Sequence, residues 1–384
     1  MSDAIDTRAA ATAFAPELRE RAEEVEAERK LPSDISKRFA EAGLYRMCVP
    51  EKFGGLEQAP AITMETIEIL ARADAAPAWV TFIGATSGTL LSLLPEATAR
   101  EIMATPETML AGVFAPRGKA VVVDGGFQAE GQWQWGSGTQ NADWILAGCQ
   151  IIRDGEVELL RNGTPRSRMM IVPASDVEFI DTWHVSGLSG TGSTDFALRD
   201  VFVPTERAAG LGVDGPLERP LYLFPQFGLL AMGIAAVAMG LARAAIDELV
   251  DIAGGKKPSG SARPLAARPA AQTDVAQAEA SLRSARAFYY DAIGTAWEEA
   301  LEGALSTDSR RDIRLATTHA VHASASAVDR MYHLAGGTSV YRTSPLQRIF
   351  RDVHVATQHM MVGPSTYELT GRLYLGLDTD VAML

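Results

Sequence analysis

The sequence predicts an α+β protein, mostly α, in which an N-terminal helical domain and a C-terminal four-helix bundle flank a middle antiparallel β domain. Three observations predict it. Both ends of the chain carry long helix-prone stretches, and the middle alternates apolar and polar residues in short runs. The chain also has 384 residues, too many for one ordinary core. We expect domains at residues 1–112, 113–212 and 213–384.

The N-terminal domain is expected to be helical. Pro32-Ser33-Asp34 is a helix start signal, and Gly43 is a stop signal. Between the helices, a loop over residues 49–57 carries the glycine pair Gly54-Gly55. Periodicity places helices over residues 9–30, 34–43, 61–76 and 78–94, the last two largely buried.

The middle domain is expected to be a small antiparallel sheet. From Val113 to about Val203 the chain has short alternating runs separated by turn residues. Asp124-Gly125-Gly126 is typical of a tight hairpin turn between two strands.

After Pro204 the chain becomes helical again. Helices are expected over residues 227–253, 275–303, 309–337 and 344–361, with a Gly/Pro-rich basic loop over 254–272. Gly336-Gly337 ends the third helix, and Ser344-Pro345 starts the fourth. Four such helices predict an antiparallel bundle. Their many Ala and Gly residues favour close packing and a broad subunit interface.

Composition excludes several classes of protein. Apolar residues make up 47% of the chain, enough for a large core, and the net charge is −13, which disfavours nucleic acid as a partner. No apolar run is expected to reach the roughly 20 residues that span a bilayer, and the charged N-terminus lacks the apolar centre of a signal peptide. Cys48 and Cys149 are expected to be buried thiols. A cytoplasmic protein without a membrane partner is expected.

A glycine-rich stretch and a pair of histidines resemble binding motifs but lack the surroundings that such motifs require. Residues 186–196 (SGLSGTGSTDF) are followed by a strand pattern, so they are not a dinucleotide fingerprint, which opens a helix. His319 and His322 lie three apart on a helix, but no carboxylate or cysteine matches them, so no metal site is expected. Ser137 stands between two glycines in a loop that can cover a flat ring, although spacing alone favours a structural loop.

The strongest local signal is residues 334–359. A Gly-Gly pair ends one helix, and the next carries Arg348, Arg351, Asp352 and His359. Backbone N–H groups at such a turn can hold a phosphate or pyrophosphate. A neutral His can act as a base, because its ordinary pKa lies near neutrality. The simpler alternative is a helix end followed by a solvated charged face.

Four motifs in order resemble the acyl-CoA dehydrogenase superfamily across nearly the whole chain. They are VPEKFGG (49–55), GQWQWGSGTQNADW (131–144), WHVSGLSGTGSTDFALRDVFVP (183–204) and GGTSVYRTSPLQRIFRD (336–352). Dehydrogenases of this family place a catalytic Glu a few residues after the Arg-Asp pair. Here that slot falls at about Met360, beside His359, which resembles the flavin-dependent monooxygenase branch: the oxygenase components of two-component aromatic hydroxylases.

The resemblance implies a homotetrameric enzyme that hydroxylates a small aromatic substrate, of the indole, phenol or aryl acid type, through a flavin C4a-hydroperoxide. It implies reduced FMN or FAD from a separate flavin reductase, and molecular oxygen. Two alternatives stay open: an FAD-dependent acyl-CoA dehydrogenase with a different base, and a non-catalytic helical scaffold of the same fold.

The same resemblance assigns roles to residues. His359 and Ser137 are the implied catalytic residues, and Gly336 and Gly337 lie near the cofactor phosphates of a neighbouring subunit. The other implied cofactor-binding residues are Thr191, Ser193, Arg263 and Trp135, and the implied substrate-pocket residues are Phe114, Thr86, Trp133 and Met360. Several phenol hydroxylases of this branch carry a second His where this chain has Thr86, which weakens the case for a phenol and leaves an indole, an aryl acid or a substrate held mostly by apolar contacts.

Overall fold

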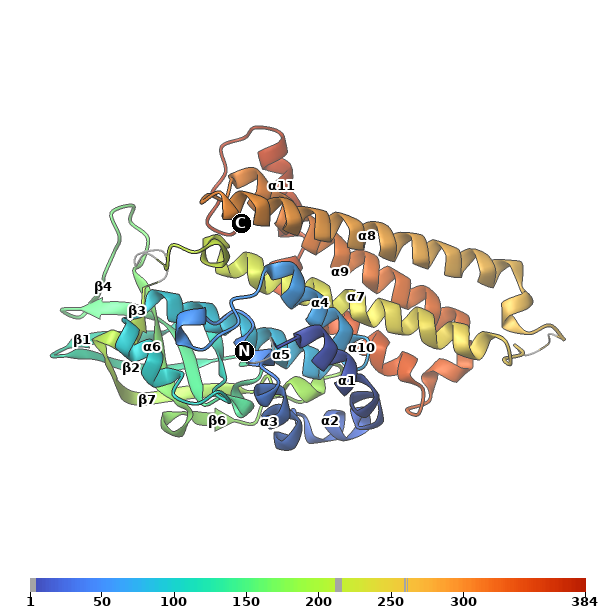
Figure 1. The fold of residues 1–384 in the computed structure, drawn as a ribbon, viewed down its shortest axis with the longest axis horizontal. Helices are drawn as coiled ribbons and strands as arrows, with labels where there is room; N and C mark the ends of the chain where they lie inside the picture. Colours follow the sequence, from blue (N-terminus) through green and yellow to red (C-terminus); the bar gives the residue numbers. More distant parts are fainter. Residues whose placement is uncertain (1–4, 211–215, 259, 261) are drawn as a thin grey trace.

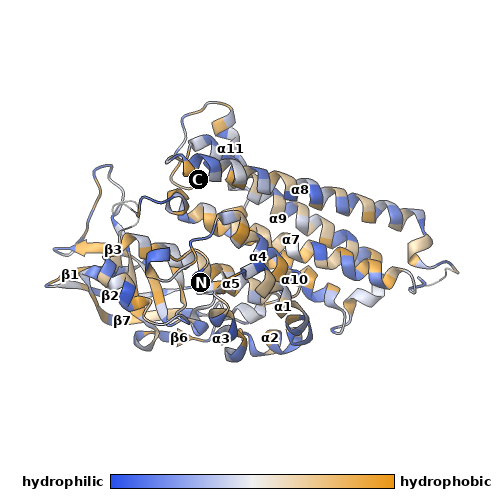
Figure 2. Cartoon of the chain, viewed as in Figure 1, coloured by the Kyte–Doolittle hydropathy of each residue, from blue (hydrophilic) through white to orange (hydrophobic). Residues whose placement is uncertain are grey.

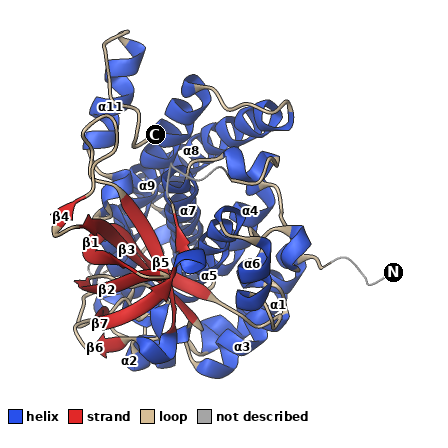
Figure 3. Ribbon diagram, turned by 90° about the vertical axis from the view of Figure 1, so that its left-hand side faces the viewer, coloured by secondary structure: helices blue, strands red, loops and turns tan. Residues whose placement is uncertain are grey.

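A computed structural model describes residues 5–210, 216–258, 260 and 262–384. Along the chain, two helical regions precede and follow a β region, as the sequence predicts; in space the sheet lies at one end of the molecule and the two helical regions pack against each other (Figure 1). Figure 3 shows the sheet in front and the long helices behind it. The expected boundary between residues 212 and 213 lies outside the described residues.

The N-terminal region, described from residue 5 onward, contains the helices α1 (Thr7–Glu20), α2 (Ala22–Glu28), α3 (Ser33–Glu41), α4 (Pro60–Ala71), α5 (Ala75–Ser87) and α6 (Glu96–Ile102). The helix expected over residues 9–30 is divided at Arg21, and α6 was not expected. The helix expected to reach residue 94 ends at Ser87 and continues as a 3-10 turn, η3 (Gly88–Leu93). Close packing requires the glycine there, because a Cβ on Gly88 would lie 2.4 Å from Val49 Cγ2.

The strands of the middle region form one sheet in the order β6-β7-β2-β1-β3-β5-β8, with β4 paired to β3. They are β1 (Leu110–Val123), β2 (Gly126–Trp133), β3 (Trp144–Arg153), β4 (Glu156–Val157), β5 (Ser167–Pro173), β6 (Glu178–Ile180), β7 (Asp195–Pro204) and β8 (Ala208–Ala209). The β1–β2 hairpin turns at Asp124-Gly125, and Gly125 has a φ of 76°, as predicted. The prediction of a wholly antiparallel sheet is corrected at one pair, because β1 and β3 run parallel.

The C-terminal region contains α7 (Gln226–Ala253), α8 (Pro269–Leu301), α9 (Thr307–Ala335), α10 (Pro345–Thr357) and α11 (Ser365–Tyr374). The fourth predicted helix ends at Thr357, so His359 lies just beyond α10 rather than on it. A short 3-10 turn, η11 (Met360–Val362), follows His359 and leads to α11, which was not expected.

Helix α7 is the central helix of the core. By length and composition it could cross a membrane, which corrects the expectation that no apolar run is long enough. However, 83% of that apolar window is buried inside the fold. A Cβ on Gly233 would lie 2.5 Å from Phe82 Cδ2, so α7 packs directly against α5. Figure 2 shows mixed hydropathy along α8 at the outer side of the bundle, in keeping with a helix that has one wet face.

Candidate active site

Three hydroxyl side chains meet where two loops of the middle region face α5. Ser137 Oγ lies 2.6 Å from Ser193 Oγ, and Thr191 Oγ1 lies 2.7 Å from Ser193 Oγ. The indole N–H of Trp79, on α5, donates to Ser137 Oγ at 3.1 Å. Two backbone hydrogen bonds hold the two loops together: Gly138 N–H donates to Thr191 O, and Gly136 N–H donates to Thr194 O. These residues are named the hydroxyl cluster.

The two tryptophans beside this cluster lie in opposite environments. Trp135 is 67% exposed and has a left-handed φ of 64°, a conformation that non-glycine residues seldom adopt. Trp133 is fully buried, stacks on Phe196 with ring centroids 5.2 Å apart, and donates its N–H to Gly148 O. Trp133 therefore belongs to the core of the sheet, and the structure does not place it on a pocket wall.

The His359 ring lies near Trp79, the residue that donates to the hydroxyl cluster, with the centroids of the two rings 6.1 Å apart. Its Nδ1 accepts the backbone N–H of Met361 at 3.2 Å, which leaves the proton of the neutral ring on Nε2. Burial, and then the nearby Arg314 cation, lower the pKa of His359 to about 4. The ring keeps some accessible surface and is a neutral N–H donor at physiological pH.

Arg314, on α9, is a functional candidate that the sequence analysis did not identify. Its side chain is 2% exposed, and its Nε and Nη1 have no hydrogen-bond partner. Its Nη2 reaches Thr366 Oγ1 at 3.5 Å, near the limit of a hydrogen bond. Burial lowers the pKa of Arg314 to about 10, so the group remains charged at neutral pH. Its position among the buried residues of the helix was the available signal, since Ile313 and Ala316 beside it are apolar and buried.

The Arg-Asp pair of α10 joins the helical regions to the loop that carries Thr191. Leu188 N–H donates to Asp352 Oδ1 at 2.6 Å. Arg351 Nη1 donates to Ser186 O at 2.6 Å and lies 2.7 Å from the Glu26 carboxylate of α2. Burial raises the pKa of Asp352 to about 7. These contacts hold the hydroxyl-bearing loop in place, a role that the motif did not reveal by itself.

Of the other predicted pocket residues, Thr86 and Phe114 are placed on either side of the start of α7. Gln226, the first residue of α7, donates to Thr86 O at 3.2 Å, and the Phe114 ring lies 6.5 Å from that of Phe227. The Thr86 hydroxyl is buried and donates to Phe82 O. Met360 is 67% exposed on the surface of a single chain.

The remaining predicted cofactor residues lie at the other end of the bundle. Gly336 ends α9, and Gly337 follows it in the 3-10 turn η10 (Gly336–Val340). Lys256, from the loop between α7 and α8, contacts Thr338 beside this pair, so the basic loop that carries Arg263 lies next to the glycine turn. Figure 1 shows that loop at the end of the molecule farthest from the sheet. The glycine turn and the basic loop therefore lie far from the hydroxyl cluster of the same chain.

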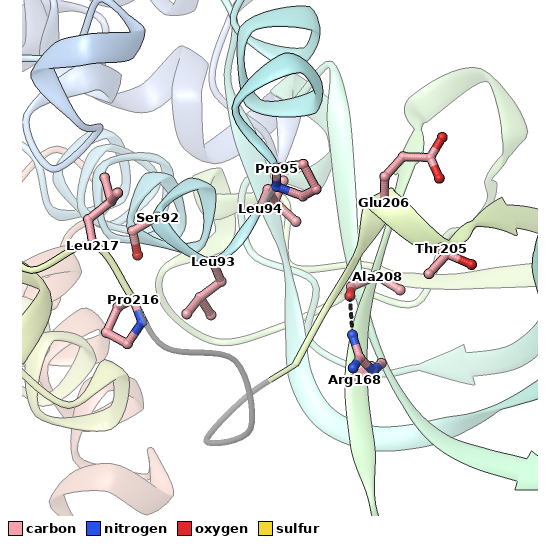
Figure 4. Close-up of a pocket in the computed structure, with 10 residues that line it drawn as sticks. All are labelled: Ser92, Leu93, Leu94, Pro95, Arg168, Thr205, Glu206, Ala208, Pro216 and Leu217. Carbon is pink, nitrogen blue, oxygen red and sulfur yellow. Dashed lines mark hydrogen bonds between the residues drawn. The ribbon is translucent and has the colours of Figure 1, made fainter.

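Two further features lie apart from the cluster. A surface cavity of about 590 Å³ between β5, β8 and the end of η3 is shown in Figure 4, where Arg168 donates to Ala208 O, and it contains none of the predicted site residues. Among the described residues, no three His, Cys, Asp or Glu side chains are grouped to hold a metal ion. His319 is exposed, and His322 bonds Val362 O. Cys48 and Cys149 are both buried free thiols, as predicted.

The residues around Ser137 fit a flavin ring. An isoalloxazine needs a flat apolar surface and neutral donors and acceptors at its polar edge. The hydroxyl cluster provides neutral groups that both donate and accept, and the exposed Trp135 indole provides a flat surface beside them. Trp79, which the sequence analysis missed, ties this cluster to the α5 helix and to the His359 ring.

Comparison with known proteins identifies relatives of the whole chain. Residues 3–101 match the acyl-CoA dehydrogenase N-terminal domain, and residues 232–364 match the acyl-CoA dehydrogenase C-terminal domain. Indole-3-acetate monooxygenase of Pseudomonas putida is 37% identical, over 93% of this chain and 90% of that protein. The flavin-dependent monooxygenase oxygenase subunit HsaA of Mycobacterium tuberculosis is 30% identical, over 100% of this chain and 98% of that protein.

A solved structure agrees with these relatives. XiaF from Streptomyces sp., in complex with FADH2 and glycerol, superimposes with a TM-score of 0.88 and 27% identity. The superposition covers 98% of each chain, so the likeness includes all three regions.

Proposed function

The chain belongs to the flavin-dependent monooxygenase branch of the acyl-CoA dehydrogenase superfamily, and on that premise we propose that it hydroxylates an indole or aryl acid. It is the oxygenase component of a two-component system, whose partner is a flavin reductase. Its cofactors are reduced flavin, FMN or FAD, and molecular oxygen. The observation that carries the proposal is the neutral His359 ring next to Trp79, directly before Met360, the position where a dehydrogenase of this family has its Glu.

Reduced flavin, when bound, activates oxygen so that one oxygen atom reaches an electron-rich ring. Ser137, Thr191 and Ser193 would hold the polar edge of the flavin, and Trp135 would cover its face. Because the hydroxyls already bond one another and Trp79, their positions are set before the cofactor arrives. A dry surrounding limits unproductive release of peroxide, and the buried wall of α5 provides it.

His359 acts at its Nε2 atom. With Nδ1 occupied by the Met361 N–H, the ring directs a neutral N–H donor into the site. A pKa of about 4 makes His359 a weak base, so donation of a hydrogen bond is favoured over removal of a substrate proton.

The substrate class follows from two observations. Thr86 carries no imidazole to bind a phenol oxygen, and its own hydroxyl is used by Phe82 O. The relative with 37% identity is an indole-3-acetate monooxygenase. An indole or an aryl acid therefore suits this pocket better than a simple phenol.

Assembly of four copies is part of the proposal. The Gly336 turn and the Arg263 loop lie at the end of the bundle away from the hydroxyl cluster, so one chain does not bring them to the same flavin. A second copy would place its glycine turn beside the cofactor phosphates. A cytoplasmic location is proposed with it. Size-exclusion chromatography with light scattering measures the assembly.

The test combines the purified protein with a generic flavin reductase, ¹⁸O₂ and a panel of indoles, aryl acids and phenols. A hydroxylated product that carries one ¹⁸O atom is expected from an indole or aryl acid. Release of hydrogen peroxide alone with every substrate contradicts the proposal. Bleaching of tightly bound FAD by an acyl-CoA would favour the dehydrogenase, and failure to bind any flavin would favour a non-catalytic scaffold.

A further inference from the structure

Arg314 is a buried cation without a partner for most of its guanidinium. Its Nε and Nη1 are both covered and unbonded, and among the described residues no other arginine leaves two nitrogens buried in this way. A buried cation without a compensating anion is costly, and proteins seldom retain one without a use. The side chain is 2% exposed within one chain, which leaves a neighbouring copy little access to it.

Other arginines of α9 have protein partners. Arg311 lies 2.7 Å from Asp308 and 2.8 Å from Asp312, and Arg330 lies 3.3 Å from Asp274. These pairs show that α9 is not short of carboxylates to match its cations. The guanidinium of Arg314 is distinct because it is buried and donates only to the Thr366 hydroxyl, at 3.5 Å.

The position of Arg314 is beside the proposed active site. Helix α9 packs on η11 and on α11, the two elements that follow His359. On the same helix, His322 bonds Val362 O at 3.1 Å, so the segment after His359 runs alongside α9. His359 is only partly buried in the single chain, so a ligand that binds Arg314 would have to enter past His359.

We infer that Arg314 binds the carboxylate of an anionic aromatic substrate, of the arylacetate class, while His359 faces the ring to be oxygenated. This inference rests on the proposed function and names its substrate class more narrowly. A guanidinium presents parallel N–H groups that match the two oxygens of a carboxylate. Since the Thr366 contact is at the limit of a hydrogen bond, a carboxylate can replace it.

The test measures binding separately from turnover. Equilibrium dialysis of the flavin-loaded protein compares indole-3-acetate with indole-3-acetamide, which has the same shape and no charge. The parent should prefer the acid by at least about tenfold, because hydrogen bonds to a charged group contribute more than neutral ones. Arg314→Met should weaken binding of the acid by about 30-fold and of the amide by less than about threefold.

The matched control is Arg330→Met, the same substitution on the same helix at a residue paired with Asp274. It should leave both affinities unchanged. Arg314→Lys keeps the charge without the paired N–H groups and should fall between the parent and Arg314→Met. Circular dichroism checks that each variant folds. If Arg314→Met does not fold, the acid preference of the parent and its reduction in Arg314→Lys decide the question.

Some results would overturn the inference. One is equal affinity of the parent for the acid and the amide. Another is an equal loss of affinity for both ligands in Arg314→Met, which would indicate a structural role for Arg314. Oxygenation of uncharged indole by the parent and by Arg314→Met is followed in parallel. If the parent oxygenates no substrate, the proposed function fails; if it oxygenates indole but shows no acid preference, only the Arg314 inference fails.

Discussion

The two ends of the helical bundle differ in how completely one chain builds them. Around Ser137, every hydroxyl has a partner, and Trp79 joins the cluster to α5. Around Gly336 and Gly337, a Cβ atom added to either glycine would meet nothing within 4 Å. The side chains around Ser137 are packed and hydrogen-bonded before any ligand binds. The turn at Gly336 and Gly337 is open and lies beside a basic loop.

This difference agrees with the proposed assembly, in which a second copy completes only the glycine-turn end. Helix α10 connects the two ends, since it starts after the glycine turn and finishes just before His359. A ring-binding end that is complete in one chain can be preorganised by folding alone. The end proposed to bind the phosphates is open in one chain and, in the proposed assembly, would be completed by a second copy, so the two ends should respond differently to substitution.

The largest expected effect separates the two tryptophans at the packed end. Trp133→Ala removes a fully buried ring that stacks on Phe196, and should lower the free energy of unfolding by about 3–5 kcal/mol. Trp135→Ala removes a ring that is 67% exposed and should change stability by less than about 0.5 kcal/mol while weakening flavin binding. Urea unfolding and flavin titration measure the two quantities. Equal destabilisation would contradict the division between core and cofactor wall.

His359→Ala tests whether the chemistry belongs to the packed end. Coupled product should fall by about 100-fold, with most of the consumed oxygen released as peroxide, while flavin binding is kept. Because the pKa of His359 is lowered to about 4, the activity of the parent should not vary with protonation of this ring above about pH 6. His319→Ala, at an exposed position of α9, is the control. A variant that hydroxylates as well as the parent would remove His359 from the mechanism.

Asp352→Asn tests how a buried carboxyl group on α10, the helix that links the two ends, affects stability at different pH values. Burial raises the pKa of Asp352 from 3.8 to about 7. The folded state therefore holds this proton at higher pH than the unfolded chain does, and the parent loses stability as pH rises from about 4 to about 7. Asparagine keeps an oxygen for the Leu188 N–H and cannot ionise. Relative to the parent, the variant should gain at least about 1.4 kcal/mol across that window, the equivalent of one pKa unit.

Urea unfolding of the parent and of Asp352→Asn at about pH 5 and about pH 8 measures this gain. Other titrating groups are common to both proteins and cancel in the difference. A stability difference that does not change with pH would show that Asp352 is ionised at both values.

The smallest expected effect lies at the open turn. Gly337→Ala places a methyl group where the single chain has open space, so it should leave the free energy of unfolding nearly unchanged and affect flavin affinity less than a charged residue does. Gly337→Asp places a negative charge where the phosphates are proposed to bind, and should weaken flavin about tenfold without destabilising the single chain. Flavin titration and light scattering separate the two variants. Equal flavin affinity in both would exclude the turn from phosphate binding.

Local patterns in the chain were sufficient for the order of its regions. Alternation located the strands, the Asp124-Gly125 turn located the β1–β2 hairpin, and Gly336 marked the end of α9. These features depend on neighbours along the chain, which a single sequence contains. Resemblance to a family added His359 and Ser137, because it compares short motifs that keep their order.

Contacts between distant segments were decided only by the folded chain. Trp79 reaches Ser137 across 58 residues, and Leu188 reaches Asp352 across 164. Trp133 and Trp135 are two residues apart and were both assigned to the site, yet one fills the sheet core and the other is exposed. The apolar neighbours Ile313 and Leu315 indicate that Arg314 is buried, but they do not indicate whether its charge is paired. Its missing partner is visible only in three dimensions, because whether a charge is compensated depends on what packing places beside it.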